Sequence, residues 1–400
     1  MRLHLDRPVT IERTRYAERW FPYLYRMPDG MLLMALQHNV DCHFSPWHYL
    51  RSVDNGRTWT HPVDNVPRLC WWHGFADGEL FEIDSYGIQD PNAPDESVYY
   101  GAWSVPNRPG DTARTGLVRV RHTQHGLTLR EMPGLPKHPW FPLWNAIHGG
   151  KDWWGECLGL DEIRLNGPYF TDIVELPGER LLAVGYFDHV GMYASDDRGQ
   201  TWEEISILND QARTGFTANE TALLRLADGT LYAVMRVESE PWGVVGRFHH
   251  AWSTDDGRTW SAPEPLSLED EPAHVVGCAW PRLAALENGA LILTYGRPGK
   301  NLIYDLTGTG QHWQGRVDLH AWELDTQALL GVPPEARLRG IVGADWTKQF
   351  DRHTDSGDYL GVAAVGPREL RVVYDVHSYV EHWNADPVSA VRMVRITVEG

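Results

Sequence analysis

The chain has 400 residues, of which 42% are hydrophobic and 22% are charged, values that are ordinary for a globular protein. Its formal net charge of −18 argues against nucleic acid or an anionic membrane surface as a partner, while leaving room for a small anion held by local arginines. No change of composition and no flexible linker divides the chain, so we expect a single domain over residues 1–400.

The beginning of the chain, MRLHLDRPVTIERTRY, has no apolar segment of the signal-peptide type, and no run of about 20 apolar residues occurs anywhere. We therefore expect a cytoplasmic protein that does not span a membrane. The four cysteines form no CxxC pair, which favours free thiols over a disulfide or zinc framework. The histidines show no HxxxH or HExxH spacing, so we expect neither a metal nor another cofactor.

Along the chain, six segments share one plan, in which an apolar stretch, a tight turn and a second apolar run follow one another. They are MPDGMLLMAL, FADGELFEI, LPGERLLAVGY, LADGTLYAVM, LENGALILTY and VGPRELRVVYDV. Asp-Gly or Asn-Gly between alternating apolar residues is the strongest short-range signal for a β-hairpin. The sequence therefore predicts six hairpins.

Three of these hairpins are followed by a motif of the form Ser-x-Asp-x-Gly-x-Thr-Trp. The copies, called Asp turns below, are Arg51–Trp59, Ala194–Trp202 and Trp252–Trp260, and Tyr304–Trp313 looks like a weakened fourth. A short carboxylate fixes a tight turn by accepting backbone N–H groups, and Gly supplies a backbone angle that other residues resist. Because equivalent copies cannot all occupy one site, we interpret Asp54, Asp197 and Asp255 as turn-forming residues rather than catalytic or metal-binding ones.

A hairpin, a third strand and a turn into a fourth strand make a four-stranded antiparallel unit, and its repetition every 50 to 60 residues or so predicts a β-propeller. We expect an all-β chain with six blades. The blades are predicted to begin near Arg19, His73, Tyr169, Asn219, Trp280 and Tyr359. Residues 110–167 are too many for a simple connection, so a seventh blade or a large insertion is the alternative there.

In a propeller blade, the innermost strand begins and the second strand ends on the same face, close to the central axis. A ligand pocket gathers its residues from those positions. Polar and aromatic residues at these positions include Trp20, His38, Asp41, Asp172, Glu220, Arg236, Trp280, Arg282, Arg297, Tyr359 and His377. Carboxylates, arginines and aromatic rings around one opening suit an anionic carbohydrate as the substrate or ligand.

The Asp turns and the blade plan resemble those of the sialidase (neuraminidase) superfamily, and ANETALLRLADGTLYAVMR is the most specific match. This resemblance implies that Glu220 polarises a nucleophilic Tyr359, which lies in the similar segment GDYLGVAAV. It further implies that Arg236, together with Arg297 in LTYGRPGKNL, holds a substrate carboxylate. Asp41 in HNVDCHF stands at about the spacing of the family's catalytic acid/base.

One departure from the family pattern concerns the arginine triad. The family's first blade carries Arg-Ile-Pro at the start of its inner strand, whereas this chain has WFPYL, with Trp20 in the place of the arginine. Arg19 is one residue away, and a shift of one residue in a strand points to the opposite face. The triad is therefore expected to be degenerate, and a pocket with two arginines, His38 and Trp20 would suit a uronic acid or another monosaccharide.

Three functions fit these observations. The first is an exo-acting glycoside hydrolase with a Tyr/Glu pair as nucleophile and an Asp as acid/base. The second is a lyase acting on a uronate, with Tyr359 or a histidine as base, and the third is a carbohydrate-binding propeller without turnover. Each site residue also has a structural interpretation: Glu220 as a partner in an ion pair, and Tyr359 or Trp280 as a packing residue.

Overall fold

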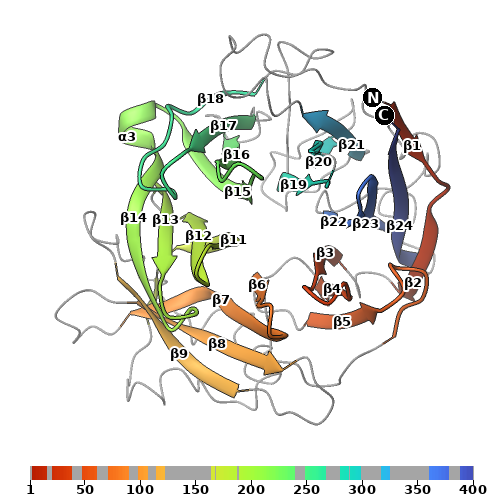
Figure 1. The fold of residues 1–400 in the computed structure, drawn as a ribbon, viewed down its shortest axis with the longest axis horizontal. Helices are drawn as coiled ribbons and strands as arrows, with labels where there is room; N and C mark the ends of the chain where they lie inside the picture. Colours follow the sequence, from red (N-terminus) through yellow and green to blue (C-terminus); the bar gives the residue numbers. More distant parts are fainter. Residues whose placement is uncertain are drawn as a thin grey trace, which may run out of the picture.

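In this computed structural model, the described residues are 2–15, 20–37, 47–60, 71–89, 98–106, 114–121, 164–166, 168–186, 189–238, 248–266, 280–287, 289–298, 317–324, 360–377 and 388–399. They form an all-β structure in which the only helix of these ranges is the four-residue α3 (Gln211–Thr214). The sheets stand around a central axis like the blades of a propeller (Figure 1). The expected all-β propeller arrangement is therefore confirmed.

The strands form five sheets. A three-stranded sheet contains β3 (Trp20–Arg26), β4 (Leu32–Gln37) and β5 (Trp47–Ser52). A nine-stranded sheet contains β6 (Trp71–Gly74), β7 (Glu79–Gln89), β8 (Val98–Pro106), β9 (Arg114–Arg121), β10 (Arg164–Asn166), β11 (Tyr169–Leu176), β12 (Arg180–Tyr186), β13 (His189–Ser195) and β14 (Thr201–Asp210).

The remaining three sheets follow in chain order. A four-stranded sheet contains β15 (Thr217–Arg225), β16 (Leu231–Glu238), β17 (Phe248–Ser253) and β18 (Glu264–Pro265). A three-stranded sheet contains β19 (Arg282–Ala285), β20 (Leu291–Pro298) and β21 (Val317–Leu324). A five-stranded sheet contains β22 (Leu360–Gly366), β23 (Glu369–His377), β24 (Val388–Glu399), β1 (Arg2–Leu5) and β2 (Val9–Arg15).

All six predicted hairpins are present as antiparallel pairs, namely β3–β4, β6–β7, β11–β12, β15–β16, β19–β20 and β22–β23. The Asp-Gly turn of the β15–β16 hairpin shows why the sequence signal works. Gly229 has φ of 93°, a value that residues with a Cβ rarely adopt, and Asp228 Oδ1 accepts the N–H of Thr230 at 2.9 Å. The turn chemistry is thus local to a few residues.

Two pairings were not expected from the sequence. The outer strands β9 and β14 pair in parallel, from Thr201 opposite Arg119 to Glu203 opposite Arg121, and so join two antiparallel groups into the nine-stranded sheet. The N-terminal strands β1 and β2 both pair with β24, so the two ends of the chain lie side by side (Figure 1). The second pairing closes the ring.

The hydrophobic core is divided among the gaps between neighbouring sheets. Each buried cluster combines strands of two sheets: β12 with β16, β16 with β20, β20 with β23, and β4 with β23. Stacking around an axis therefore buries both faces of most sheets.

The Asp turns have the geometry that their residue types predict. Asp54 accepts the N–H of Thr58 at 2.9 Å, the hydroxyl of Thr58 at 2.6 Å and the hydroxyl of Ser52 at 2.7 Å. Hydrogen bonding from the Thr58 side chain is the main cause that lowers the pKa of Asp54 to about 2. The same bonds recur at Asp197 and Asp255, which confirms a turn-forming role for all three carboxylates.

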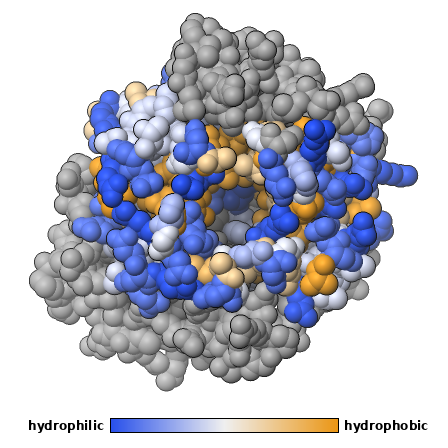
Figure 2. All heavy atoms as spheres, in the orientation of Figure 1, coloured by the Kyte–Doolittle hydropathy of each residue, from blue (hydrophilic) through white to orange (hydrophobic). Residues whose placement is uncertain are grey.

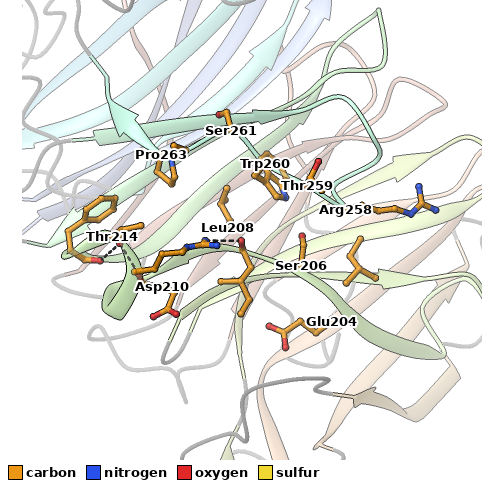
Figure 3. A pocket seen from close by; sticks show the side chains of 15 residues that line it. Glu204, Ser206, Leu208, Asp210, Thr214, Arg258, Thr259, Trp260, Ser261 and Pro263 are labelled. Atoms are coloured by element: carbon orange, nitrogen blue, oxygen red, sulfur yellow. Dashed lines mark hydrogen bonds between the residues drawn. The ribbon is translucent and has the colours of Figure 1, made fainter.

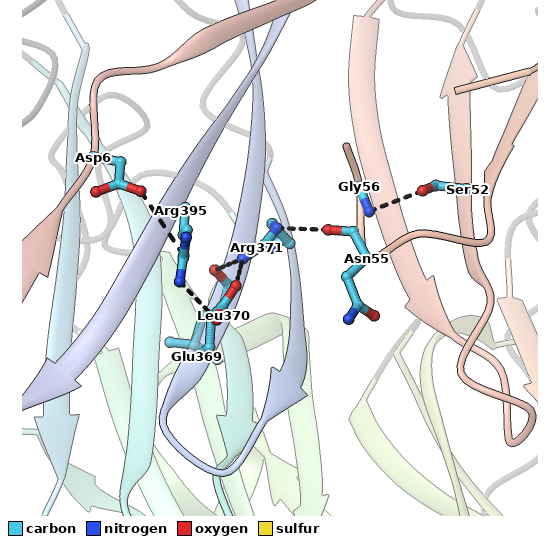
Figure 4. Close-up of polar contacts among 8 residues, drawn as sticks. All are labelled: Asp6, Ser52, Asn55, Gly56, Glu369, Leu370, Arg371 and Arg395. Atoms are coloured by element: carbon cyan, nitrogen blue, oxygen red, sulfur yellow. Dashed lines mark hydrogen bonds and ion pairs between the residues drawn. The ribbon is translucent and has the colours of Figure 1, made fainter. Parts of the chain in front are cut away.

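Each Asp turn also packs against strands that precede it around the ring. A Cβ added to the turn glycine would lie 2.9 Å from Met393 Sδ at Gly56, 2.5 Å from the Phe81 ring at Gly199, and 3.0 Å from Leu182 Cδ2 at Gly257. Glycine is therefore required both by its left-handed φ and by this close approach. For the first Asp turn the preceding sheet is the last one in the chain, and Arg371 Nε donates to Asn55 O across that boundary at 2.8 Å (Figure 4).

Candidate functional site

The site follows from the direction of the strands. In each hairpin the inner strand begins where the second strand ends, as the register shows for Trp20 opposite Gln37 and for Thr217 opposite Glu238. The starts of the inner strands and the ends of their partners therefore share one face of the ring. Seen along the axis, the surface is hollowed at the centre (Figure 2). Five inner strands, β3, β11, β15, β19 and β22, line an axial cavity of about 310 Å³, mainly with residues from their middle and hairpin ends, such as Arg26 and Leu224.

Three of these inner strands carry an irregularity near their start. The register shifts between Trp20 and Tyr23 in β3, between Phe170 and Asp172 in β11, and between Ala218 and Thr221 in β15. A bulge re-aims the side chains around it, and bulges are frequent next to active sites. These bulges were not predictable, because the hydrophobic alternation of a strand does not reveal where its pairing is interrupted.

Glu220 lies within the bulge of β15. Glu220 is 6% exposed, and its Oε2 accepts a hydrogen bond from Arg236 Nη1 at 2.8 Å. Arg236 comes from β16, the partner strand of the hairpin, and 22% of its side chain is exposed. The structure thus brings together two residues that the sequence analysis had selected, as a buried carboxylate and a partly exposed guanidinium.

Asp172 lies in β11 and connects this strand to the next inner strand. Its Oδ2 accepts the N–H of Leu223 in β15 at 3.0 Å, and its Oδ1 accepts the N–H of Ile173 at 3.0 Å. The carboxyl is deep in the molecule although it borders the axial cavity, and burial raises its pKa to about 6, while the positive charge of Arg282 acts in the opposite direction. The neighbouring hydroxyl of Thr171 donates to Thr221 O at 2.9 Å, so the two inner strands are linked twice.

Arg282 and Trp280 lie on the same side of the axis. The guanidinium carbon of Arg282 is 4.3 Å from the centre of the Trp280 ring and 4.8 Å from the centre of the Tyr23 ring, and Nε donates to Leu360 O at 3.3 Å. Trp280 is 1% exposed and meets Tyr23 edge-on at 5.8 Å. In these contacts Trp280 behaves as a packing residue that supports Arg282, rather than as an open platform for a sugar ring.

The other selected residues are described in part or not at all. Trp20, Arg297 and His377 lie in β3, β20 and β23, opposite Gln37, Asp318 and Ser389 respectively. His38, Asp41 and Tyr359 fall outside the described residues. Their roles therefore stay predictions.

One further buried carboxylate, Glu204, was not singled out from the sequence. Glu204 in β14 pairs with His189 Nε2 and lies 3.4 Å from the hydroxyl of Tyr193. A Cβ on Gly191 would be 2.6 Å from Glu204 Oε1, so the absence of a side chain there makes room for the cluster. Across the described parts of the chain, no group of three or more His, Cys, Asp or Glu could hold a metal ion. Nor does any helix among those residues have the length and apolarity that a membrane crossing requires.

Comparisons with known proteins agree with this architecture. Residues 162–328 match the BNR repeat-like domain family. A protein of unknown function from Dyadobacter fermentans has a similar solved structure, with 15% sequence identity and a TM-score of 0.62 over 99% of each chain. The NanB sialidase from Streptococcus pneumoniae is also similar, with 12% identity and a TM-score of 0.54 over 98% of this chain and 70% of that chain.

None of the curated proteins compared with the chain matches it. At these identities the solved structures establish the fold alone. Residues 162–328 are thus similar to the BNR repeat-like domain, and the chain has a β-propeller fold like that of these solved structures.

Proposed function

We propose that this chain is an exo-acting glycoside hydrolase of the sialidase-like type, which removes a terminal acidic sugar from a glycan. The observation that supports it most is the pair formed by Glu220, on the bulged inner strand β15, and Arg236, on its partner strand β16. Enclosing a charge pair is costly unless its groups are well satisfied, and strained or buried charged groups beside a cleft are typical of functional sites. A carbohydrate is accordingly the proposed partner of the protein.

The proposal includes a six-bladed ring formed by a single domain over residues 1–400. Each of the six hairpins would belong to one blade, and the nine-stranded sheet would be two blades joined by the parallel pairing of β9 and β14. Since β1 and β2 complete the sheet of β24, the last blade would include strands from both ends of the chain.

In the proposed mechanism, Glu220 accepts the proton of the Tyr359 hydroxyl as the phenolic oxygen attacks the anomeric carbon. A phenol is a weak nucleophile at its free pKa of about 10, so it needs a neighbouring base. Attack by a neutral residue also avoids repulsion of an anionic substrate, and sialidases are the known tyrosine exception among glycosidases. Asp41 would protonate the leaving oxygen and then activate a water molecule that releases the sugar.

Substrate binding is proposed to rest on Arg236 and Arg297. The planar fork of a guanidinium can bind a carboxylate through two parallel hydrogen bonds. Arg236 is placed to do this because part of its side chain is exposed while Glu220 holds the other part. Trp20, His38, Asp172, Arg282 and His377 complete the proposed binding set, with Trp280 acting behind Arg282.

The test is product analysis on a panel of sialylated and uronate-containing glycans. Hydrolysis predicts a released reducing sugar with oxygen from water, and Glu220→Gln and Tyr359→Phe should each lower kcat about 100-fold or more. Glu175→Gln is the matched control, because Glu175 also contacts a basic side chain, with Oε2 2.8 Å from His73 Nε2, but lies at the hairpin end of β11. This control should keep its activity.

Two other outcomes would each support a different function. An unsaturated product absorbing in the ultraviolet would show a lyase, and binding without any product would show a carbohydrate-binding propeller. Full activity in both Glu220→Gln and Tyr359→Phe would remove these residues from the mechanism.

A further inference from the structure

The bulge that carries Glu220 needs support from outside its own hairpin. Asn219 and Glu220 together stand opposite Arg236 of β16, where a regular ladder has a single residue. An interruption of this kind leaves hydrogen bonds of the ladder unmade, and buried backbone groups still require partners. The backbone around Glu220 must therefore find part of its hydrogen bonds among side chains.

Two side chains of the bulge hold the peptide group that precedes Glu220. The N–H of Glu220 donates to Asn219 Oδ1 at 2.7 Å. The carbonyl oxygen of the same peptide group, Asn219 O, accepts the hydroxyl of Thr221 at 2.7 Å. Both polar atoms of this peptide group are thus occupied, and its orientation is fixed by the residues on either side of Glu220.

The third support comes from the neighbouring inner strand β11. The hydroxyl of Thr171 donates to Thr221 O at 2.9 Å. Thr171 is itself part of a bulge, because the register of β11 passes from Phe170 directly to Asp172. The two bulges therefore face each other, and the side chain of one bonds the backbone of the other. Thr171 and Thr221 are both 0% exposed, so neither can touch a substrate.

These bonds form one chain that runs from β11 to the base of the proposed reaction. Thr171 holds the carbonyl of Thr221, the hydroxyl of Thr221 holds the carbonyl of Asn219, and Asn219 holds the N–H of Glu220. At the other end of Glu220, Arg236 holds the carboxylate at 2.8 Å. A catalytic group must be fixed in this way by its neighbours, since a misplacement of about 1 Å can cost roughly 100-fold in rate.

We propose that Thr171 is a positioning residue, which keeps Glu220 in place for proton transfer by holding the β15 bulge from β11. The inference rests on the proposed function, in which Glu220 is the base. Thr171 acts through Thr221 and Asn219 and makes no contact with the sugar. Its loss is therefore expected to lower the rate of the chemical step and to leave substrate binding nearly unchanged.

The experiment compares Thr171→Val and Thr171→Ser with the wild type in steady-state hydrolysis of sialyllactose and of an oligosaccharide that ends in glucuronate. Valine keeps the shape of threonine and removes the hydroxyl, so kcat should fall about tenfold while KM stays within a factor of about two. Serine restores the donor, and Thr171→Ser should keep kcat within about threefold of the wild type. A loss of general stability would not give this separation of kcat from KM.

Ser206→Ala is the matched control. The hydroxyl of Ser206 also donates to a backbone oxygen, Gly257 O, and this bond joins the same two sheets as the bond of Thr171. Ser206 belongs to the outer strand β14, however, at a cavity of about 940 Å³ beside Trp260 (Figure 3). Its variant should lower the midpoint of thermal unfolding, as Thr171→Val does, and keep the kcat of the wild type.

Asn219→Ala tests the same chain of bonds at a partly exposed position, should Thr171→Val not fold. It removes the acceptor of the Glu220 N–H and should also lower kcat about tenfold. Full kcat in Thr171→Val or, in its place, in Asn219→Ala would overturn the inference and leave the proposed hydrolysis standing. Equal losses in Thr171→Val and Ser206→Ala, or no recovery in Thr171→Ser, would do the same. A wild type that hydrolyses neither probe would overturn the proposed function and the inference with it.

Discussion

At the scale of single residues, two carboxylates on neighbouring inner strands have opposite environments. Glu220 faces a guanidinium, whereas Asp172 accepts two backbone N–H groups beside the axial cavity. Hydrogen bonds to amides favour the carboxylate, yet burial is the larger effect at Asp172 and raises its pKa to about 6. Asp172 therefore changes charge near pH 6, within the pH range in which proteins are normally studied.

This raised pKa has a consequence for stability. Asp172 binds its proton more tightly in the folded chain than in the unfolded one, so folding is relatively favoured at low pH and this advantage is lost as the pH rises from about 4 to about 6. The loss is up to about 3 kcal/mol, and less to the extent that water in the cavity solvates the carboxylate. In Asp172→Asn the side chain no longer titrates.

Urea unfolding of the wild type and Asp172→Asn between pH 4 and 7 checks this prediction. The variant loses one hydrogen-bond acceptor at every pH, so it should be less stable than the wild type at pH 4. The difference in unfolding free energy should shrink, or reverse, by pH 7. A difference that stays constant with pH would mean that Asp172 titrates in its ordinary range.

At the scale of the structural element, the Asp turn combines a local motif with a contact to strands of the preceding hairpin. The bonds of Asp197 with Ser195 and Thr201 shape the turn, and Gly199 carries a φ of 88°. The same glycine also lies against the Phe81 ring of the preceding strands. Glycine is therefore required at this position for two reasons: its left-handed φ and its close contact with the Phe81 ring.

The two demands can be separated with alanine substitutions. Gly178 in the β11–β12 turn has a φ of 83° but nothing within 4 Å of an added Cβ, so Gly178→Ala measures the backbone cost alone, roughly 1–2 kcal/mol. Gly199→Ala should cost about 1–3 kcal/mol more, because its Cβ would lie 2.5 Å from the Phe81 ring. Denaturant unfolding of both variants gives the comparison, and equal losses would show that the ring moves aside freely.

At the scale of the whole molecule, the last sheet closes the ring through its strands and through Arg371. This residue is 5% exposed, pairs with Glu369, and donates to Asn55 O in the first Asp turn (Figure 4). Arg395 on the same sheet also bonds Glu369, at 3.0 Å, but 48% of its side chain is exposed. The two arginines share a partner and differ in burial.

We expect Arg371→Gln to lower the unfolding free energy by about 2–3 kcal/mol, because it takes a charge-assisted bond from Asn55 O and leaves Glu369 partly uncompensated. Arg395→Gln should cost less than about 1 kcal/mol, as is usual for exposed ion pairs. Chemical unfolding of both variants at low and high salt distinguishes the two arginines, since salt should strongly weaken only the exposed Arg395–Glu369 ion pair. Equal effects would contradict the role of Arg371 in closing the ring.

Features that depend on a few consecutive residues were predictable. The six hairpin turns and the Asp turns rest on hydrogen bonds between residues at most a few positions apart, and the pairing of Glu220 with Arg236 follows from their places in one hairpin. The bulges of β3, β11 and β15 were not predictable, because an interrupted register leaves no mark on the alternation of apolar residues. The burial of Trp280 by Tyr23 and Arg282 likewise depends on a distant segment.

The sequence by itself determined the repeating hairpin unit and the turn chemistry, because these follow from local backbone preferences. Only the tertiary structure decided which sheets meet. The parallel pairing of β9 with β14, the joining of β1 and β2 to β24 and the cavity beside Trp260 all arise between segments far apart in the chain. Such contacts depend on how the sheets pack around the axis, and no local pattern specifies that packing.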